Sequence, residues 1–491
     1  MGPHTTPQIE APQPFLVNQH TPKNKSDNVN INKSQWWTWN VHGADPIKLH
    51  RAMNNPKIGW QWFFWLVHLL GGSTIIAMLF SIEVFTAWVV FIFWTSTLIP
   101  DPGTVVWPYF NHLVLPLMVV RGWREGGPWS CYLLWWAFGM LPLMDAAVGM
   151  DVKVLARYTC TRERRALAAN KWFRLPALVA APVAAGLLLW AARDVGVGAT
   201  GGFTRLEFAG LCLSVGVYCG GMSLVFGHEL GHRHHHEDSS FPWARAEQLA
   251  ARVLLCLTCY GHFSVEHNRG HHKRVGTDAD PGTARLGEGY WHFAFRAICG
   301  EHISAWRLES RRVAERDLLW WHHELIWTSL AQAALALGLY AAWGPRATVL
   351  YFGQSLTGHL LFQVVNYIEH YGLERRQGAD GTPAEAVAPR HAWDSPARFG
   401  NMAFLNLMRH ADHHARADKR WPLLDHRPEA PQLPSGYALC ALMAFMPPLW
   451  RRVMDPRVAA HRASDPGLRG QVFRHTSSKW AVTTKNEKKE L

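Results

Sequence analysis

The stretch Phe226-Gly227-His228-Glu229-Leu230-Gly231-His232 lies where a long apolar run gives way to a polar segment rich in histidine. His228 and His232 are four residues apart, so on a helix they share one face and both imidazoles can reach one metal ion. Taken alone, this spacing fits a zinc protease with Glu229 as general base as well as it fits an iron site. The rest of the chain has to decide between the two.

The composition around this stretch indicates a membrane protein. Of the 491 residues, 48% are hydrophobic and 26 are tryptophan, and several apolar runs reach the ~18–20 residues needed to cross a hydrocarbon core. We therefore expect an all-α, polytopic bundle of membrane-spanning helices. The net charge of +12 comes with no nucleic-acid motif, so we interpret the basic residues as topology signals.

The chain is predicted to have four parts: a polar, disordered N-terminal tail (1–56), an apolar hairpin of spans (57–103), a membrane domain (104–457) and a polar C-terminal tail (458–491). Seven lysines and arginines between Asp151 and Arg174 place that loop in the cytoplasm by the positive-inside rule. Counting spans from this loop, the apolar run 206–226 crosses back and delivers His228 at the cytoplasmic surface.

Three further histidine segments follow, and this topology puts all of them on the same membrane face as the first. They are His267, His271 and His272, spaced i, i+4 and i+5; His370 at the end of a span; and His410, His413 and His414, spaced i, i+3 and i+4. Nine imidazoles exceed the three protein ligands of a catalytic zinc, so we expect two metal ions. A nitrogen-rich redox site with open positions favours iron.

Carboxylates stand next to these histidines in the sequence, at Glu229, Glu266, Glu369 and Asp412. They could bind metal directly. We expect instead that they accept the distal N–H of the imidazoles, which fixes each ring and raises its basicity.

These motifs resemble one family, the integral-membrane alkane 1-monooxygenases, which are non-haem diiron ω-hydroxylases. The resemblance covers roughly residues 130–457 and is carried by HELGH (228–232), EHNRGHHK (266–273), NYIEHYGL (366–373) and LMRHADHHA (407–415). It implies nine iron ligands, namely His228, His232, His267, His271, His272, His370, His410, His413 and His414. It also implies a desaturase/hydroxylase-like bundle of six core spanning helices in the bacterial inner membrane, with a cytoplasm-facing diiron site. The apolar stretch before residue 104 would add two spans as an N-terminal hairpin, which keeps the site on the cytoplasmic side.

The resemblance further implies a reaction, the terminal hydroxylation of alkanes to 1-alkanols with O₂. The electrons would come from NAD(P)H through rubredoxin reductase and a separate rubredoxin, because the sequence shows neither a dinucleotide-binding fingerprint nor the paired CxxC motifs of an attached rubredoxin. An acidic rubredoxin would suit a basic cytoplasmic face.

The helix at 129–147 is a candidate wall of the channel that brings the alkane from the bilayer. It combines Trp135 and Trp136 with the small Ala137, and it leads to Asp145 just below the expected site. We expect the small side chain at position 137 to leave the channel deep. An alanine that serves only helix packing explains the same residue equally well.

Other functions fit parts of this pattern. A membrane fatty-acyl desaturase or hydroxylase is close in chemistry, but its first box normally has four residues between the histidines, and a xylene-type monooxygenase acting on aromatic methyl groups stays open. An intramembrane zinc protease would leave seven clustered histidines unexplained. A histidine-rich metal transporter would place its ligands at mid-membrane, inside the spans.

Overall fold

The computed structural model of the chain describes residues 82–97, 106–152, 170–198, 202–232, 241–376, 385–468, 471 and 473–474, and all of them belong to one compact unit, residues 44–491. Throughout these residues the regular structure is helical, as predicted. The N-terminal tail, much of the predicted hairpin, most of the basic loop 151–174 and residues 475–491 lie outside the described residues.

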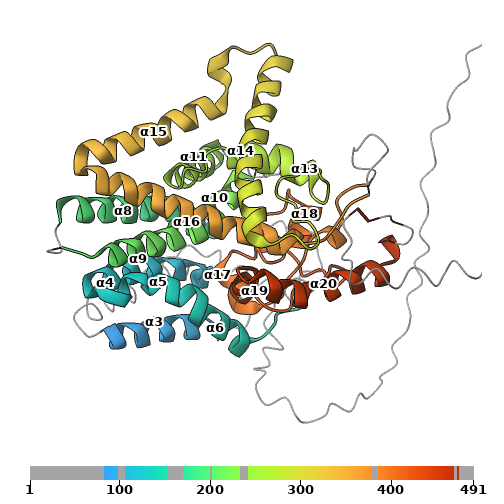
Figure 1. Cartoon of the computed structure of the whole chain (residues 1–491), viewed down its shortest axis with the longest axis horizontal. Coiled ribbons are helices and arrows are strands. Elements are labelled where there is room, and N and C mark those ends of the chain that lie inside the picture. Colours follow the sequence, from blue (N-terminus) through green and yellow to red (C-terminus); the bar gives the residue numbers. More distant parts are fainter. Residues whose placement is uncertain are drawn as a thin grey trace, which may run out of the picture. The chain divides into compact units, whose positions relative to one another are not determined.

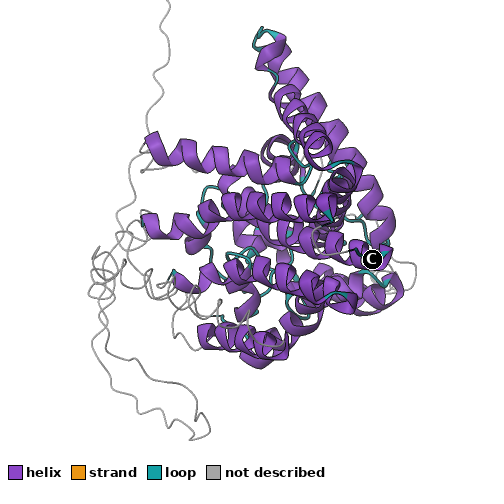
Figure 2. Ribbon diagram, turned by 90° about the vertical axis from the view of Figure 1, so that its left-hand side faces the viewer, coloured by secondary structure: helices purple, strands orange, loops and turns teal. Residues whose placement is uncertain are grey.

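The helices are labelled in Figure 1. Their bounds are α3 (Ile82–Thr97), α4 (Leu115–Glu125), α5 (Tyr132–Trp135), α6 (Leu141–Val148), α8 (Leu175–Val197), α9 (Arg205–Gly216), α10 (Ser223–Gly231), α11 (Phe241–Leu257), α12 (Phe263–Glu266), α13 (His272–Arg274), α14 (Tyr290–Glu315), α15 (Glu324–Trp343), α16 (Pro345–His370), α17 (Arg398–Ala403), α18 (His410–Ala415), α19 (Tyr437–Ala444) and α20 (Pro447–Ser464). Figure 2 shows the same helices from the side.

Four continuous helical stretches are long and apolar enough to cross a membrane. They are Gly127–Val148, Trp172–Val197, Arg205–Gly231 and Glu324–Trp343. Helix α16 is 26 residues long and packs against α8, α9 and α15, but its buried face carries Gln354 and Gln363. The described residues thus establish a membrane bundle with four candidate spans, and the six core spans expected from the sequence stay a prediction.

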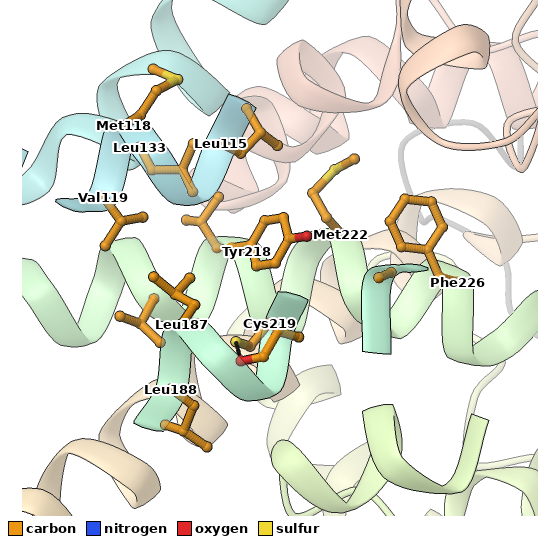
Figure 3. Close-up of a cluster of buried hydrophobic side chains, with 14 of the residues drawn as sticks. Leu115, Met118, Val119, Leu133, Leu187, Leu188, Tyr218, Cys219, Met222 and Phe226 are labelled. Carbon is orange, nitrogen blue, oxygen red and sulfur yellow. Dashed lines mark hydrogen bonds between the residues drawn. The ribbon is translucent and has the colours of Figure 1, made fainter. Parts of the chain in front are cut away.

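The core of the bundle is a cluster of apolar side chains below the histidine-bearing helix ends (Figure 3). Leu115 and Met118 of α4 belong to this cluster together with Tyr218, Met222 and Phe226, which lie just before the first histidine box. Gly220, in the helical stretch that leads to α10, lies against Gly358 of α16. The two backbones approach so closely that a Cβ on either glycine would overlap the other residue. Small residues allow this kind of close packing between membrane helices. It holds α10 and α16, which carry His228 and His370, in a fixed relation.

Helix α14 crosses the bundle near the end that carries the histidines, and a turn at 316–323 connects it to α15 (Figure 1). This corner is held by Glu309, whose side chain is fully buried. Glu309 accepts hydrogen bonds from Arg312 Nη2 at 2.6 Å and Nε at 2.8 Å, from the Glu324 amide at 2.9 Å, and from Arg269. One carboxylate therefore connects α14, the start of α15 and the second histidine segment.

Burial raises the pKa of Glu309, but the bonds from Arg312, the Glu324 amide and Arg269 outweigh burial and lower that pKa to about 2. Its folded pKa is below the unfolded value, so its contribution to stability is complete above pH ~4.5 and is lost as the pH falls towards 2. Glu309→Gln should destabilise the corner by about 3 kcal/mol. Hydrogen exchange of residues 316–323 measures this, with exposed Glu315→Gln as the control. Equal exchange rates in both variants would contradict the assignment.

Candidate metal centre

All nine predicted histidines come together in two adjacent groups at the end of the bundle. The first group is His228, His232, His267, His272 and His413, and the second is His271, His370, His410 and His414. Within each group the ligand nitrogens all lie within 4.8 Å of one another. Eight of the rings are buried and that of His272 is half-buried, so the nitrogens face each other in the interior. Segments separated by up to 186 positions, from 228 to 414, converge here.

The second histidine segment can serve both groups because its backbone is a π-turn. Residues His267–His271 form a π-helical stretch in which the His272 amide donates to the His267 carbonyl, five residues back. In an α-helix two residues five apart would point roughly 140° away from each other, whereas a π-turn brings them onto one face. His267 and His272 therefore share the first group, with their Nε2 atoms 2.9 Å apart, while His271 points to the second.

Helix α18 divides its histidines in a similar way. His410 and His414 are one turn apart and join the second group, and His413 joins the first. The other two segments each serve one group, since α10 with its C-cap brings His228 and His232 to the first and the end of α16 brings His370 to the second. Two segments thus bridge the groups, and the sites are built as a pair.

The spacing of the nitrogens fits metal ions. In the first group the Nε2 of His267 lies 2.8 Å from that of His228 and 3.1 Å from that of His232. Neutral imidazoles have one N–H each, so a set of converging ring nitrogens leaves lone pairs facing each other unless a cation lies between them. Metal–nitrogen bonds of about 2.1 Å at right angles put neighbouring nitrogens about 3.0 Å apart. Five nitrogens in one group also exceed the four ligands of a tetrahedral zinc.

Buried nitrogens without a hydrogen-bond partner lead to the same interpretation for the second group. In the described part of the chain, His271 Nε2 and both ring nitrogens of His414 are buried and have no partner. A buried polar atom without a partner carries a free-energy cost of about 1–3 kcal/mol. A bound cation would remove that cost, so the residues present fit the two iron ions that the sequence predicts.

In three of the four rings of the second group the Nδ1 atom lies close to an oxygen atom, and in His271 and His370 it makes a hydrogen bond. His271 Nδ1 donates to Asp280 Oδ2 at 2.9 Å, His370 Nδ1 lies 3.4 Å from the carbonyl oxygen of His391, and His410 Nδ1 lies 3.1 Å from Glu369 Oε1. In each of these rings the Nε2 atom is on the side that faces the other histidines of the group. This outer layer of acceptors sets ring orientation and ligand basicity in metal sites.

The four predicted carboxylates divide between two roles. Glu369 takes the expected place beside a histidine of the site. Glu266 and Asp412 differ from the prediction, because Glu266 binds Arg274 at 2.6 Å and Asp412 binds Lys419, Arg427 and the Asp425 amide. Glu229 accepts from the Trp421 amide at 3.3 Å. These contacts position the loops that enclose the histidines.

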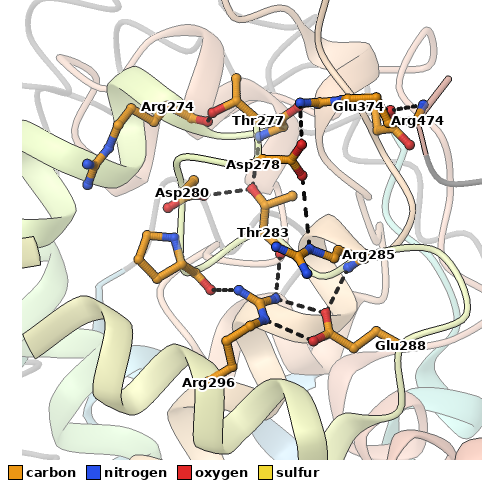
Figure 4. Close-up of polar contacts among 12 residues, drawn as sticks. Arg274, Thr277, Asp278, Asp280, Thr283, Arg285, Glu288, Arg296, Glu374 and Arg474 are labelled. Atoms are coloured by element: carbon orange, nitrogen blue, oxygen red, sulfur yellow. Dashed lines mark hydrogen bonds and ion pairs between the residues drawn. The ribbon is translucent and has the colours of Figure 1, made fainter. Parts of the chain in front are cut away.

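Asp280, which accepts a hydrogen bond from His271, was not predicted from the sequence to have a role in the site. It lies in a loop eight residues after His272, so no helical spacing relates it to a histidine. The loop is held by many polar contacts (Figure 4). Thr283 donates to Asp280, and Arg296 binds the carbonyl oxygens of Pro281 and Thr283. Burial raises the pKa of Asp280, but the adjacent His271 outweighs burial and lowers that pKa to about 2, so Asp280 is ionised at neutral pH.

Asp280→Asn should weaken iron binding in the second group by about 10–100-fold, because it removes the charged acceptor that orients His271. Iron affinity is measured by competition with a chelator. Asp278→Asn is the control, since this exposed residue of the same loop pairs with Arg474 and Arg285. An affinity in the Asp280 variant equal to that of the control would contradict the role of Asp280.

An apolar cavity of about 100 Å³ lies in the bundle. Trp136 and Ala137 line it, together with Met222 and Val225 from the helix that leads to His228. Tyr437 also lines it, and its hydroxyl donates to Glu369 Oε1 at 2.5 Å. Because Glu369 in turn lies beside His410, two side chains, Tyr437 and Glu369, separate the cavity from a histidine of the second group.

Two of the residues proposed for the channel lie elsewhere. Trp135 is 61% exposed on the outside of the bundle, where its Nε1 donates to the Pro128 carbonyl oxygen. Neighbouring helical positions point about 100° apart, so Trp135 and Trp136 cannot both face the cavity. Asp145 is buried but does not line the cavity. It accepts from the Gly400 amide at 2.7 Å and so ties α6 to α17.

Sequence comparison agrees with this arrangement. The fatty acid desaturase family model matches residues 206–453, about half of the chain, and this range contains all nine histidines. A helical membrane bundle with histidine groups at one end and this match define a membrane protein of the desaturase class.

Comparison with curated relatives shows which family within the desaturase class the chain resembles. The chain is 38% identical to alkane 1-monooxygenase 1 of Pseudomonas aeruginosa over 340 residues, which is 69% of this chain and 85% of the relative. It is 34% identical to an alkane 1-monooxygenase of Ectopseudomonas oleovorans over 74% of this chain and 86% of the relative. The chain belongs to the alkane 1-monooxygenase family and is an oxidoreductase. A xylene/toluene monooxygenase hydroxylase component of Pseudomonas putida is 26% identical over half of the chain.

Proposed function

We propose that this chain hydroxylates alkanes at the terminal carbon, using O₂ and two non-haem iron ions held by the nine histidines. The observation that carries the proposal is the presence, in one bundle, of the two histidine groups and an apolar cavity that is separated from His410 by Tyr437 and Glu369. Bound iron would supply an oxidant strong enough for an unactivated C–H bond. The overall reaction consumes one alkane, O₂, two electrons and two protons, and it yields one 1-alkanol and one water.

The residues of the chain have three tasks in this reaction. The histidines hold the metal ions, Asp280 fixes the orientation of His271, and Glu369 lies beside His410. The cavity binds the alkane through apolar contacts alone, which suits a substrate with no polar group. Its walls also exclude water from the reacting atoms, which protects the oxidant from side reactions.

The electrons must reach the site from another protein. In the part of the chain that the structure describes, no cysteine cluster resembles a rubredoxin site, and burial raises the pKa of the Cys256 thiol to about 11, so it is not a thiolate. We propose rubredoxin as the direct donor, reduced by an NAD(P)H-dependent reductase. By the positive-inside rule, the histidines face the cytoplasm from a bacterial inner membrane.

A reconstituted assay tests this function. The purified, iron-loaded chain is given octane with rubredoxin, rubredoxin reductase and NADH, and the products are separated by gas chromatography. We expect 1-octanol in an amount coupled to NADH oxidation. An iron-replete protein that leaves octane unchanged, while the same donors reduce it, would reject terminal alkane hydroxylation.

The relative that acts on xylene and toluene makes aromatic methyl groups a second candidate substrate. The cavity is lined by Trp136, Phe138 and Phe404, which suit an aromatic ring as well as a chain. Product from toluene but none from octane in the same assay would favour this substrate.

A further inference from the structure

A groove of about 460 Å³ lies on the surface between α14 and the loop at residues 274–281. Its lining is mixed, with Ile303, Ser304 and Leu308 from α14 and Pro281 from the loop. Three arginines, Arg274, Arg307 and Arg311, also line it, and we call it the arginine groove. It is separate from the apolar cavity and shares no lining residue with it.

Two of these arginines are available for an external anion. Arg307 and Arg311 are exposed and one helical turn apart, and among the described residues neither makes an ion pair or a hydrogen bond. The nearby Glu309 does not neutralise them, because its carboxylate is buried and occupied by Arg312 and Arg269. Like charges four residues apart on a helix repel each other. Anionic groups placed on both guanidiniums would relieve that repulsion and form strong, bidentate hydrogen bonds.

Residues that line the groove are next in sequence to residues that contact the histidines of the metal centre. Ala279 and Pro281 line it, and the residue between them, Asp280, holds His271. Arg274 lines it two residues after His272, and its guanidinium binds Glu266, which precedes His267. A molecule seated in the groove would therefore be separated from a histidine of the second group by little more than Asp280.

We propose that the arginine groove is the docking site of a small acidic electron-transfer protein, with carboxylates of that protein on Arg307 and Arg311. The inference rests on the proposed function, which requires two electrons per turnover from outside the chain. A partner protein fits the groove better than a phosphate headgroup because the groove offers apolar contacts from Pro281, Ile303 and Leu308 as well as the arginines, as protein interfaces do. The short path through Asp280 explains why docking here would serve electron transfer.

Direct binding tests the site without relying on turnover. The iron-loaded chain, in nanodiscs of uncharged lipid, is titrated with oxidised rubredoxin of net negative charge at low salt, and Kd is measured. The variant is Arg307→Glu with Arg311→Glu. The control reverses two exposed arginines of α20, Arg452→Glu with Arg457→Glu, which changes the net charge by the same amount.

We expect the groove variant to raise Kd by at least about tenfold and to weaken the salt dependence of binding, with the control close to the unmodified chain. The groove variant should also raise KM for rubredoxin, while iron content and single turnover driven by dithionite stay unchanged. Equal Kd values in the two variants would overturn the proposal, and so would a groove variant that loses only affinity for phosphatidylglycerol vesicles. A chain that binds rubredoxin at the groove but leaves octane unchanged would reject the proposed function and keep the docking site.

Discussion

Replacing His414 with alanine is expected to lower alkane hydroxylation by at least about a thousandfold. His414 belongs to the four-histidine group, and in the described chain neither of its ring nitrogens has a hydrogen-bond partner, although both are buried. The substitution therefore breaks no hydrogen bond within the protein. Its effect should come from the lost metal ligand, because three imidazoles remain where four converged. Elemental analysis should show about one iron fewer per chain.

The control for this experiment is His292→Ala. His292 is 73% exposed on α14, far from both groups in the sequence, and its partner Glu288 keeps its contacts with Arg296. This variant should keep its iron and its activity. Full iron content and activity in the His414 variant would exclude this histidine from the metal centre.

Ala137→Trp is expected to shorten the longest alkane that the chain accepts, with a loss of at least about tenfold for that substrate and little change for short alkanes. Ala137 lines the cavity, half-buried between Trp136 and Phe138 on a π-helical stretch. A cavity of about 100 Å³ has no room for an indole without losing most of its depth. Product profiles from a series of n-alkanes measure the effect.

Leu143→Trp serves as the matched control, since Leu143 lies on the same span but is 63% exposed on its outer side. It should leave the product profile unchanged. If the Ala137 variant also keeps its profile, position 137 has a packing role only.

The sequence was most informative where local geometry determined the outcome. The spacings of His228 with His232 and of His410 with His414 each fit one helical turn. The two members of each pair lie in the same group, the first pair in the group of five and the second pair in the group of four. His370 has no spacing partner, and its position at the end of a span predicts its place on the same membrane face as the other segments. The division of the nine histidines into five and four was not predictable, because it depends on a π-turn at His267–His271 that no propensity specifies.

Side-chain direction and loop contacts were the least predictable features. Trp135 and Trp136 are neighbouring residues of the same type. Only the packing of the bundle determines that Trp135 is exposed on the outside and that Trp136 lines the cavity. Asp280 contacts His271 through a loop that is held by distant residues, including Arg296. Residues near each other in the sequence can be placed by periodicity, but contacts of this kind require the fold.

The metal content of the purified chain tests the central claim most directly. The protein is produced with iron and zinc both present in the medium, purified in detergent and examined by elemental analysis, with Mössbauer spectroscopy on a sample enriched in ⁵⁷Fe. The two histidine groups predict about two irons per chain in a nitrogen-rich environment. A single zinc per chain, with no gain of iron on reconstitution, would contradict the account.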